Sequence, residues 1–257
     1  CELMAGDPVA ITGSASGLGA ALRARLESEG REVIGVDLRD QEISADLSTT
    51  EGRVAAVDAV REASGGSLSG AVACAGLGPQ VTPHRLIAAV NYFGATSFLD
   101  GVGPLIERGG AAVAVASNSA TMTLQDDEGL VDLLLDGNEE AALEVADRIH
   151  GAFVYGMSKL ALSRAVRRRV EEWGARGVRL NAIAPGPIDT PLLQGGLDDP
   201  ELGPLIEALP VPLDRRASAD EIAAVAQFLL SDDAGYVHGS IVFCDGGSDA
   251  LARPDGF

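Results

Sequence analysis

Val9-Ala-Ile-Thr-Gly-Ser-Ala-Ser-Gly-Leu-Gly19 joins a short apolar segment to a glycine-rich turn, and a helical run over residues 20–29 follows. The order strand, glycine turn, helix directs main-chain N–H groups and a helix N-terminus at phosphate, and glycine lets a pyrophosphate approach closely. The glycines stand at positions 13, 17 and 19, which is not the G-x-G-x-x-G spacing of the dinucleotide fingerprint. A purely structural turn is therefore the alternative at this point.

A second apolar segment, residues 32–37, ends in the carboxylate of Asp37. In a strand–helix–strand unit this carboxylate reaches the adenosine ribose, accepts hydrogen bonds from its hydroxyls and repels a 2′-phosphate. Arg39, two residues further on, could hold such a phosphate, but the glycine turn itself contains no basic residue. The sequence therefore favours NAD over NADP as the cofactor.

Apolar strand-like segments alternate with helix-like runs along the rest of the chain. Further strands are expected at a short segment ending at Leu47 and at residues 70–76, 110–116, 177–184 and 240–244. The helices are expected from a cap at Ser48 to Arg61, and over residues 85–99, 153–170 and, after a cap at Ser218, 220–230. Such alternation predicts one α/β domain over residues 1–257, with a Rossmann-type doubly wound parallel sheet and helices on both faces. Ligands of such sheets bind beyond the carboxyl ends of the strands, where Asp37, Gly76 and Ser117 fall.

Two stretches are longer than plain connections need to be. Residues 121–151 contain two helix-like runs, 126–136 and 138–149, with Asn138 as an N-cap, and we expect an inserted helical hairpin there. Its apolar stripe consists of Ala142, Val145, Ala146 and Ile149. Residues 186–216 are rich in Pro and Gly, and we expect an irregular loop that covers the substrate.

Tyr155 and Lys159 stand four residues apart in an expected helix, so the phenol and the ammonium share one face. Taken alone, such a pair is most often a solvated pair on a helix surface. An ammonium at ~4 Å contributes about 4 kcal/mol at an effective dielectric near 20, which is what lowers a phenol pKa from about 10 to about 7. Ser117 follows an apolar strand directly, and Ser119 is its rival as the hydroxyl facing the pair. Asn91, amid apolar residues, is either a local structural bridge or part of a polar site.

Composition restricts the classes of partner. The net charge of −19 repels nucleic acid and anionic lipid, so neither nucleic acid nor a membrane is expected as a partner. The three cysteines, Cys1, Cys74 and Cys244, do not form a disulfide framework, and two of them lie in apolar runs. With no apolar run close to ~18 residues and no leader-like segment, we expect a cytoplasmic protein. No residues are assigned to a metal.

Motifs from Val9 to about Gly247 resemble, in chain order, those of the short-chain dehydrogenase/reductase superfamily. They are Thr12-Gly-Ser-Ala-Ser-Gly-Leu-Gly19, Cys74-Ala-Gly76, Asn91, Ser117, Tyr155-x-x-x-Lys159, Pro185-Gly186 with Thr190, and Asp245-Gly-Gly247. Within that superfamily the chain is most similar to the bacterial 3α-hydroxysteroid dehydrogenase/carbonyl reductase group. That narrower resemblance rests on Cys74-Ala-Gly-Leu-Gly-Pro-Gln80, Val90-Asn-Tyr-Phe-Gly-Ala95, the long segment before Tyr155, and the Arg253-Pro254…Phe257 ending.

The resemblance implies a role for each matching residue. Tyr155 exchanges the proton, Lys159 holds the ribose and lowers the tyrosine pKa, Ser117 binds the substrate oxygen, and Asn91 anchors a water. The family commonly shows Asn-Ile-Ser-Ser at this strand, whereas this chain has Val115-Ala-Ser-Asn-Ser119, which keeps Ser119 as a rival. The implied cofactor-binding residues are Gly13, Ser16, Gly17, Leu18, Gly19, Asp37, Asp46, Leu47, Ala75, Gly76, Tyr155, Lys159, Pro185, Ile188 and Thr190.

The expected function is an NAD-dependent oxidoreductase that interconverts a secondary alcohol and a ketone, with a 3α-hydroxysteroid or another carbonyl compound as substrate. One alternative is a smaller, non-steroid alcohol or ketone. Another, from a different class, is a nucleotide-binding regulator without catalysis. The segment 121–151 precedes a helix that this superfamily commonly uses for subunit pairing, so the usual tetramer is not implied. A homodimer or another homo-oligomer is expected.

Overall fold

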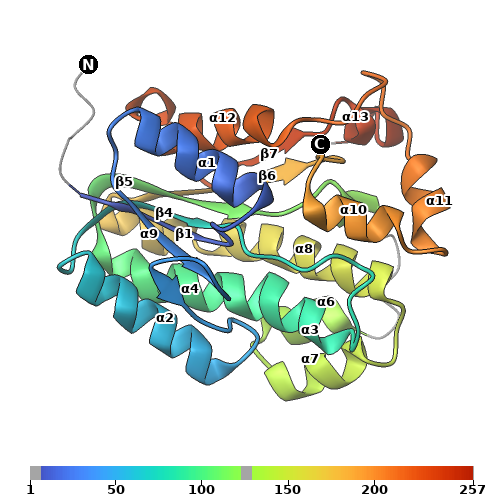
Figure 1. Cartoon of the computed structure of the whole chain (residues 1–257), viewed down its shortest axis with the longest axis horizontal. Coiled ribbons are helices and arrows are strands. Elements are labelled where there is room, and N and C mark those ends of the chain that lie inside the picture. Colours follow the sequence, from blue (N-terminus) through green and yellow to red (C-terminus); the bar gives the residue numbers. More distant parts are fainter. Residues whose placement is uncertain (1–6, 123–128, 257) are drawn as a thin grey trace.

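The computed structural model describes residues 7–122 and 129–256 (Figure 1). In these residues parallel strands form one seven-stranded sheet, in the order β3-β2-β1-β4-β5-β6-β7. The strands are β1 (Val9–Thr12), β2 (Val33–Asp37), β3 (Ile43–Ser44), β4 (Leu68–Ala73), β5 (Ile106–Val115), β6 (Arg179–Pro185) and β7 (Ile241–Cys244). The chain passes from β3 at one edge across β1 to β4, and doubly wound sheets bind ligands where the strand order reverses in this way. The expected single-domain, doubly wound fold is confirmed.

Helices cover both faces of the sheet (Figure 1). They are α1 (Gly17–Ser28), α2 (Thr50–Ala63), α3 (Arg85–Ala88), α4 (Ala95–Val102), α5 (Ser119–Met122), α6 (Leu130–Leu135), α7 (Glu139–Ala146), α8 (Gly151–Arg168), α9 (Val170–Arg176), α10 (Pro191–Leu197), α11 (Leu202–Glu207), α12 (Ala219–Leu230) and α13 (Ser248–Ala252). A π-helical turn, Ala89–Gly94, joins α3 to α4. The expected helix over residues 85–99 is therefore present and continues to Val102. None of the helices in the described residues is long and apolar enough to cross a membrane.

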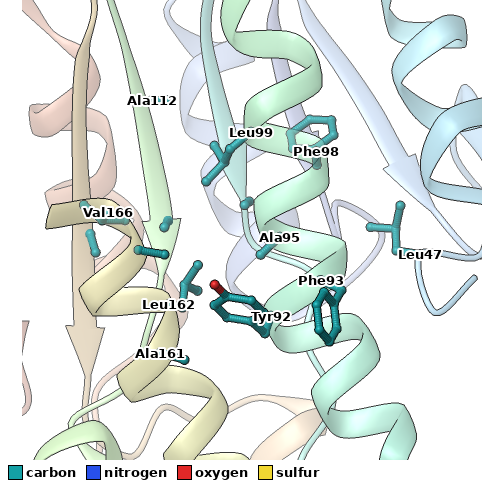
Figure 2. Packing of buried hydrophobic residues seen from close by; sticks show 14 of the residues in the cluster. Leu47, Tyr92, Phe93, Ala95, Phe98, Leu99, Ala112, Ala161, Leu162 and Val166 are labelled. Atoms are coloured by element: carbon teal, nitrogen blue, oxygen red, sulfur yellow. The ribbon is translucent and has the colours of Figure 1, made fainter. Parts of the chain in front are cut away.

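Alternate residues of each strand supply two separate cores. In β1, Val9 and Ile11 pack with α1 and α12 on one face, whereas Ala10 packs with α2, α4 and α8 on the other. Side chains on both faces of a parallel strand are buried, which is why these segments read as continuous apolar runs. Figure 2 shows Tyr92 of the π-helical turn directed toward Leu162 of α8, so these two helices are packed against each other beside the sheet.

Polar side chains cap the helices, and one expected cap is wrong. The N-cap of α2 is Thr49, whose hydroxyl accepts from the Gly52 N–H, and not Ser48. Ser48 belongs to the turn before the helix, where its own N–H donates to the Asp46 carboxylate. The expected cap at Ser218 is confirmed as a capping box with Glu221, and such a cap contributes about 1 kcal/mol.

Two short helices, α6 and α7, precede α8. Residues 126–128, the expected start of the first helix, lie outside the described residues. The second helix, α7, ends at Ala146 and not at the expected Ile149. Asn138 caps α7 as expected. Arg53 of α2 is almost fully buried and pairs with Glu139 of α7 at 2.7 Å, which ties α7 to the main body. The interpretation of residues 121–151 as an insertion stays a prediction.

The segment 186–216 is not irregular throughout, so that expectation is wrong. Thr190 caps α10 with Pro191 at its first position, and the Asp199 carboxylate accepts from Glu201 and Leu202 at the start of α11. Proline disfavours a helix interior but suits the first turn, where its missing N–H leaves no bond unmade. Pro191 therefore starts a helix here. The C-terminal helix α13 was also not expected.

Candidate active site

A cavity of about 720 Å³ opens at the carboxyl ends of the strands and extends under α10 and α11. Every predicted site residue except Asn91 lines it, although these residues come from widely separated parts of the chain. The lining set is Gly13, Ser16, Gly17, Leu18, Gly19, Asp37, Asp46, Leu47, Ala75, Gly76, Ser117, Tyr155, Lys159, Pro185, Ile188 and Thr190. The fold thus brings predicted residues from seven separate segments of the chain into one space.

The glycine turn forms a cradle that side chains would fill. Gly13 has φ of +70°, and a Cβ there would lie 2.7 Å from the Ala75 Cα, while a Cβ on Gly19 would collide with the Gly13 carbonyl. The turn leads into α1, whose N-cap Ser16 makes no side-chain cap and whose first turn carries no acidic residue. Free N–H groups at the positive end of a 12-residue helix therefore face the cavity. This geometry suits an anion such as a pyrophosphate.

Asp37 ends β2 at the rim of this cradle. Its two carboxylate oxygens accept from the Ala15 N–H at 3.0 Å and the Leu38 N–H at 2.7 Å. Arg23 of α1 is already held by Glu27 and Glu42, and it keeps the pKa of the Glu42 carboxyl at about 2. Arg39 is exposed beyond the strand end. A carboxylate, and not a cation, is the fixed charge at this end of the cavity.

Tyr155 and Lys159 of α8 meet the end of β5 at the middle of the cavity. The Lys159 ammonium is buried and donates to the Val115 carbonyl at 2.8 Å, and its nitrogen lies 5.8 Å from the centre of the Tyr155 ring. Burial lowers the pKa of Lys159 to about 8. The pair is therefore not a solvated surface pair, which was the alternative for this motif.

The expected acidic phenol is not found in this structure. Burial raises the pKa of Tyr155 above its ordinary value, and a hydrogen bond with Ser117 acts in the opposite direction. The expected lowering required an ammonium about 4 Å from the phenol oxygen, whereas Lys159 is directed to the Val115 carbonyl instead. With the side chains so placed, desolvation of the phenol outweighs the effect of the Ser117 hydroxyl.

Asn91 does not line the cavity and lies just behind it. Its amide accepts from the Leu77 N–H at 2.7 Å and donates to the Leu77 carbonyl at 3.0 Å, so it braces the loop that follows β4. A Cβ on Gly76 would lie 3.3 Å from the Asn91 oxygen and 3.6 Å from the Lys159 nitrogen. The local structural bridge is the role that the contacts describe. The water expected at Asn91 stays a prediction.

The two rival serines lie together at the end of β5. The Ser117 oxygen accepts from the Ser119 hydroxyl at 3.0 Å and from the Ser119 main-chain N–H at 3.2 Å. Both residues line the cavity, but it is the Ser117 hydroxyl that lowers the pKa of Tyr155. The structure therefore favours Ser117 as the hydroxyl facing the phenol.

The far end of the cavity, which sequence reasoning did not resolve, is apolar. Its lining includes Pro79, Val81, Leu86, Met122, Leu192, Leu202, Leu205, Ile206 and Leu209. Four of these residues, Leu202, Leu205, Ile206 and Leu209, recur at the i, i+3, i+4, i+7 spacing of one helix face. That spacing is the signal that could have identified α11.

Comparison with known proteins gives matches over almost the whole length. The 3-alpha-hydroxysteroid dehydrogenase/carbonyl reductase of Comamonas testosteroni is 44% identical, over 97% of this chain and 99% of that protein. The crystal structure of the 3-alpha-hydroxysteroid dehydrogenase from Pseudomonas sp. B-0831 complexed with NADH superposes with a TM-score of 0.92 at 43% identity, covering 97% of this chain and 99% of that one.

More distant matches agree with these two. The coniferyl-alcohol dehydrogenase of Pseudomonas sp. (strain HR199) is 32% identical over 93% of this chain and 95% of that protein. Residues 141–249 also match the sequence family described as enoyl-(acyl carrier protein) reductase. Since the first of these relatives is similar over nearly its entire length, the chain belongs to the short-chain dehydrogenase/reductase family of oxidoreductases.

Proposed function

We propose that this protein uses NAD to interconvert a secondary alcohol and a ketone of an apolar, ring-containing substrate, with a 3α-hydroxysteroid as the first candidate. One observation carries the proposal. A single cavity runs from the glycine cradle and Asp37, past Tyr155 and Ser117, to an apolar end beneath α10 and α11. A polar substrate oxygen and an apolar substrate body thus have separate places in the same space.

The nucleotide end fits a dinucleotide whose ribose carries free hydroxyls. The N–H groups at the start of α1 would receive the pyrophosphate, and Asp37 would accept from the adenosine ribose while repelling a 2′-phosphate. Asp46 and Leu47 would flank the adenine, and Lys159 would hold the second ribose. Bound NAD supplies the acceptor for the hydride that leaves the alcohol carbon, and NADH supplies the donor in reverse.

The Tyr155 oxygen would carry the proton. In oxidation, the alcohol O–H bond breaks and its proton passes to the phenolate, which becomes phenol; in reduction, the phenol returns that proton to the forming alkoxide. Ser117 cannot serve as a base at neutral pH, but its O–H can orient the substrate oxygen and stabilise charge developing on it. Because burial raises the pKa of Tyr155, the neutral phenol needed for ketone reduction is the form that predominates at pH 7.

The substrate class is inferred from the apolar end and from the relatives. Side chains such as Val81, Leu192 and Leu209 offer contacts to hydrocarbon, and removing apolar surface from water contributes about 25 cal/mol per Å². Two relatives with more than 40% identity are named as 3-alpha-hydroxysteroid dehydrogenases. A steroid or a compound of similar apolar bulk therefore suits the cavity better than a small hydrophilic alcohol.

The test is a substrate panel with the purified protein. NADH formation is followed with 3α-hydroxysteroids and small secondary alcohols, and NADH consumption with the corresponding ketones, each repeated with the phosphorylated cofactor. We expect turnover with NAD(H), a higher kcat/KM for steroids than for small substrates, and oxidation that accelerates as pH rises. Absence of turnover with every alcohol and ketone, despite NADH binding, would contradict the proposed activity.

A further inference from the structure

The Ser117 hydroxyl is held from behind by a second serine. Ser119, at the start of α5, directs both its main-chain N–H and its side-chain hydroxyl at the Ser117 oxygen, at 3.2 Å and 3.0 Å. A serine hydroxyl carries one proton to donate and two lone pairs that accept. The main-chain N–H can only donate, so at least one of the lone pairs is occupied regardless of how the hydroxyls rotate.

When the Ser119 hydroxyl also donates, both lone pairs of Ser117 are engaged, and only the proton of Ser117 is free to make a further bond. Ser117 is 7% exposed, and the open space it adjoins is the cavity that also contains Tyr155. Its proton is therefore directed at an acceptor there, either the phenol oxygen or the oxygen of a ketone or alkoxide. Without Ser119, the hydroxyl could rotate and present a lone pair, which would repel the same oxygen.

We propose that Ser119 is a positioning residue that fixes Ser117 as a hydrogen-bond donor toward the substrate oxygen. The inference rests on the proposed alcohol–ketone activity. It adds a residue that acts through Ser117, because the proton of its hydroxyl is used there. It also gives a physical reason for Ser-Asn-Ser at residues 117–119, where one serine would suffice for contact with the substrate.

The decisive test is a double-mutant cycle in steady-state kinetics. Losing one hydrogen bond to Ser117 should lower the kcat of Ser119→Ala about fivefold with the KM for NADH unchanged, whereas Ser117→Ala should lower kcat about 100-fold. If Ser119 acts only through Ser117, adding Ser119→Ala to Ser117→Ala changes kcat by less than about twofold. Ser119→Thr, which keeps the hydroxyl, should restore most of the activity.

Two kinetic outcomes would overturn the inference. A fivefold loss that persists in the Ser117→Ala background means that Ser119 contacts the substrate itself. An unchanged kcat in Ser119→Ala means that the hydroxyl does not position anything. Thr96→Val is the matched control, because Thr96 is a buried hydroxyl that bonds within its own helix, at the Tyr92 carbonyl, away from the cavity. Should Ser119→Ala fail to fold, Ser119→Cys, a weaker donor of similar size, replaces it in the cycle.

A measurement without turnover separates this inference from the proposed function. The ionisation of Tyr155 can be followed by NMR on isotope-labelled tyrosine, with Tyr155→Phe to assign the signal. Ser117 lowers the pKa of Tyr155, so Ser119→Ala should raise that pKa, and the double variant should raise it no further than Ser117→Ala alone. If the pKa of Tyr155 is the same in Ser119→Ala as in the parent, the inference is contradicted even in an inactive protein. If that pKa rises in Ser119→Ala, the inference is supported whatever the substrate is.

Discussion

The two ends of the cavity are built by different means. The nucleotide end consists of strand ends and a glycine turn whose main chain makes the contacts, so its shape follows from the sheet. The apolar end is made largely of side chains on and next to α10 and α11, two short helices that lie outside the two main cores. Main-chain cradles depend on a few glycines at fixed spacing, whereas an apolar wall can be assembled from many sequences. Under the proposed function, one end sets the class of cofactor and the other sets the class of substrate.

Tyr155 lies between the two ends, so its loss should abolish turnover without altering either. We expect Tyr155→Phe to lower kcat about 1000-fold for every substrate, which is the usual size of a general acid–base contribution. The phenyl ring remains, so NADH affinity measured by fluorescence should stay within about twofold of the parent. Turnover that survives in this variant would remove Tyr155 from proton transfer.

Lys159 should show a stability cost for its place at the junction. Its folded pKa of about 8 lies below the ordinary 10.5, so below pH 8 the folded state holds a desolvated charge that the unfolded state hydrates. That penalty, about 3 kcal/mol, is relieved as pH rises from 8 to 10.5, above which lysine is neutral in both states. Lys159→Met should therefore be the more stable protein at pH 7 and lose that advantage by pH 10.5.

Denaturant unfolding of the parent and Lys159→Met at matched pH isolates this effect, because all other titrations cancel in the difference. A difference in unfolding free energy that stays constant from pH 7 to 10.5 would show that Lys159 is not desolvated. The variant should also lose turnover, which makes Lys159 a residue kept for function at a cost in stability.

The difference between the ends also explains what the sequence could predict. Strands, the glycine cradle, Asp37 and the Tyr155–Lys159 pair have short, regular spacing, and sheet topology then brings them together without further information. The direction of the Tyr155 pKa shift is not predictable in this way, because burial of the phenol and the contact of Lys159 with the Val115 carbonyl are both tertiary features. The pattern does not predict α10 and α11, because Pro191 and the neighbouring glycines are typical of loops, although Pro191 stands at a helix start.

Changing Asp37 should affect the nucleotide end alone. Asp37→Ala removes a charged hydrogen-bond acceptor and its repulsion of a 2′-phosphate. The ratio of kcat/KM for NAD to kcat/KM for NADP should therefore fall by about tenfold to 100-fold, mainly through the KM of each cofactor. The order of preference among substrates should not change. Asp40→Asn is the control, because Asp40 is an exposed carboxylate three residues on that does not line the cavity. A parent enzyme that already prefers NADP would contradict the role of Asp37.

Changing Leu205 should affect the apolar end alone, and more weakly. Leu205 of α11 lines the cavity although it is 62% exposed, so a substrate of apolar bulk would cover it on binding. Losing that contact in Leu205→Ser should raise the KM for a steroid about fivefold and leave the KM for NADH unchanged. A small ketone that does not reach α11 should be turned over as by the parent.

Leu251→Ser provides the matched comparison, because Leu251 on α13 is 56% exposed and lies outside the cavity lining. Both substitutions remove a similar exposed leucine, so a general effect on the surface would appear equally in the two variants. An equal rise in KM for steroid and small ketone in Leu205→Ser would mean that α11 shapes the whole cavity instead of only its apolar end. A steroid KM that is the same in Leu205→Ser and Leu251→Ser would place the substrate body elsewhere, and the apolar wall would then have another use.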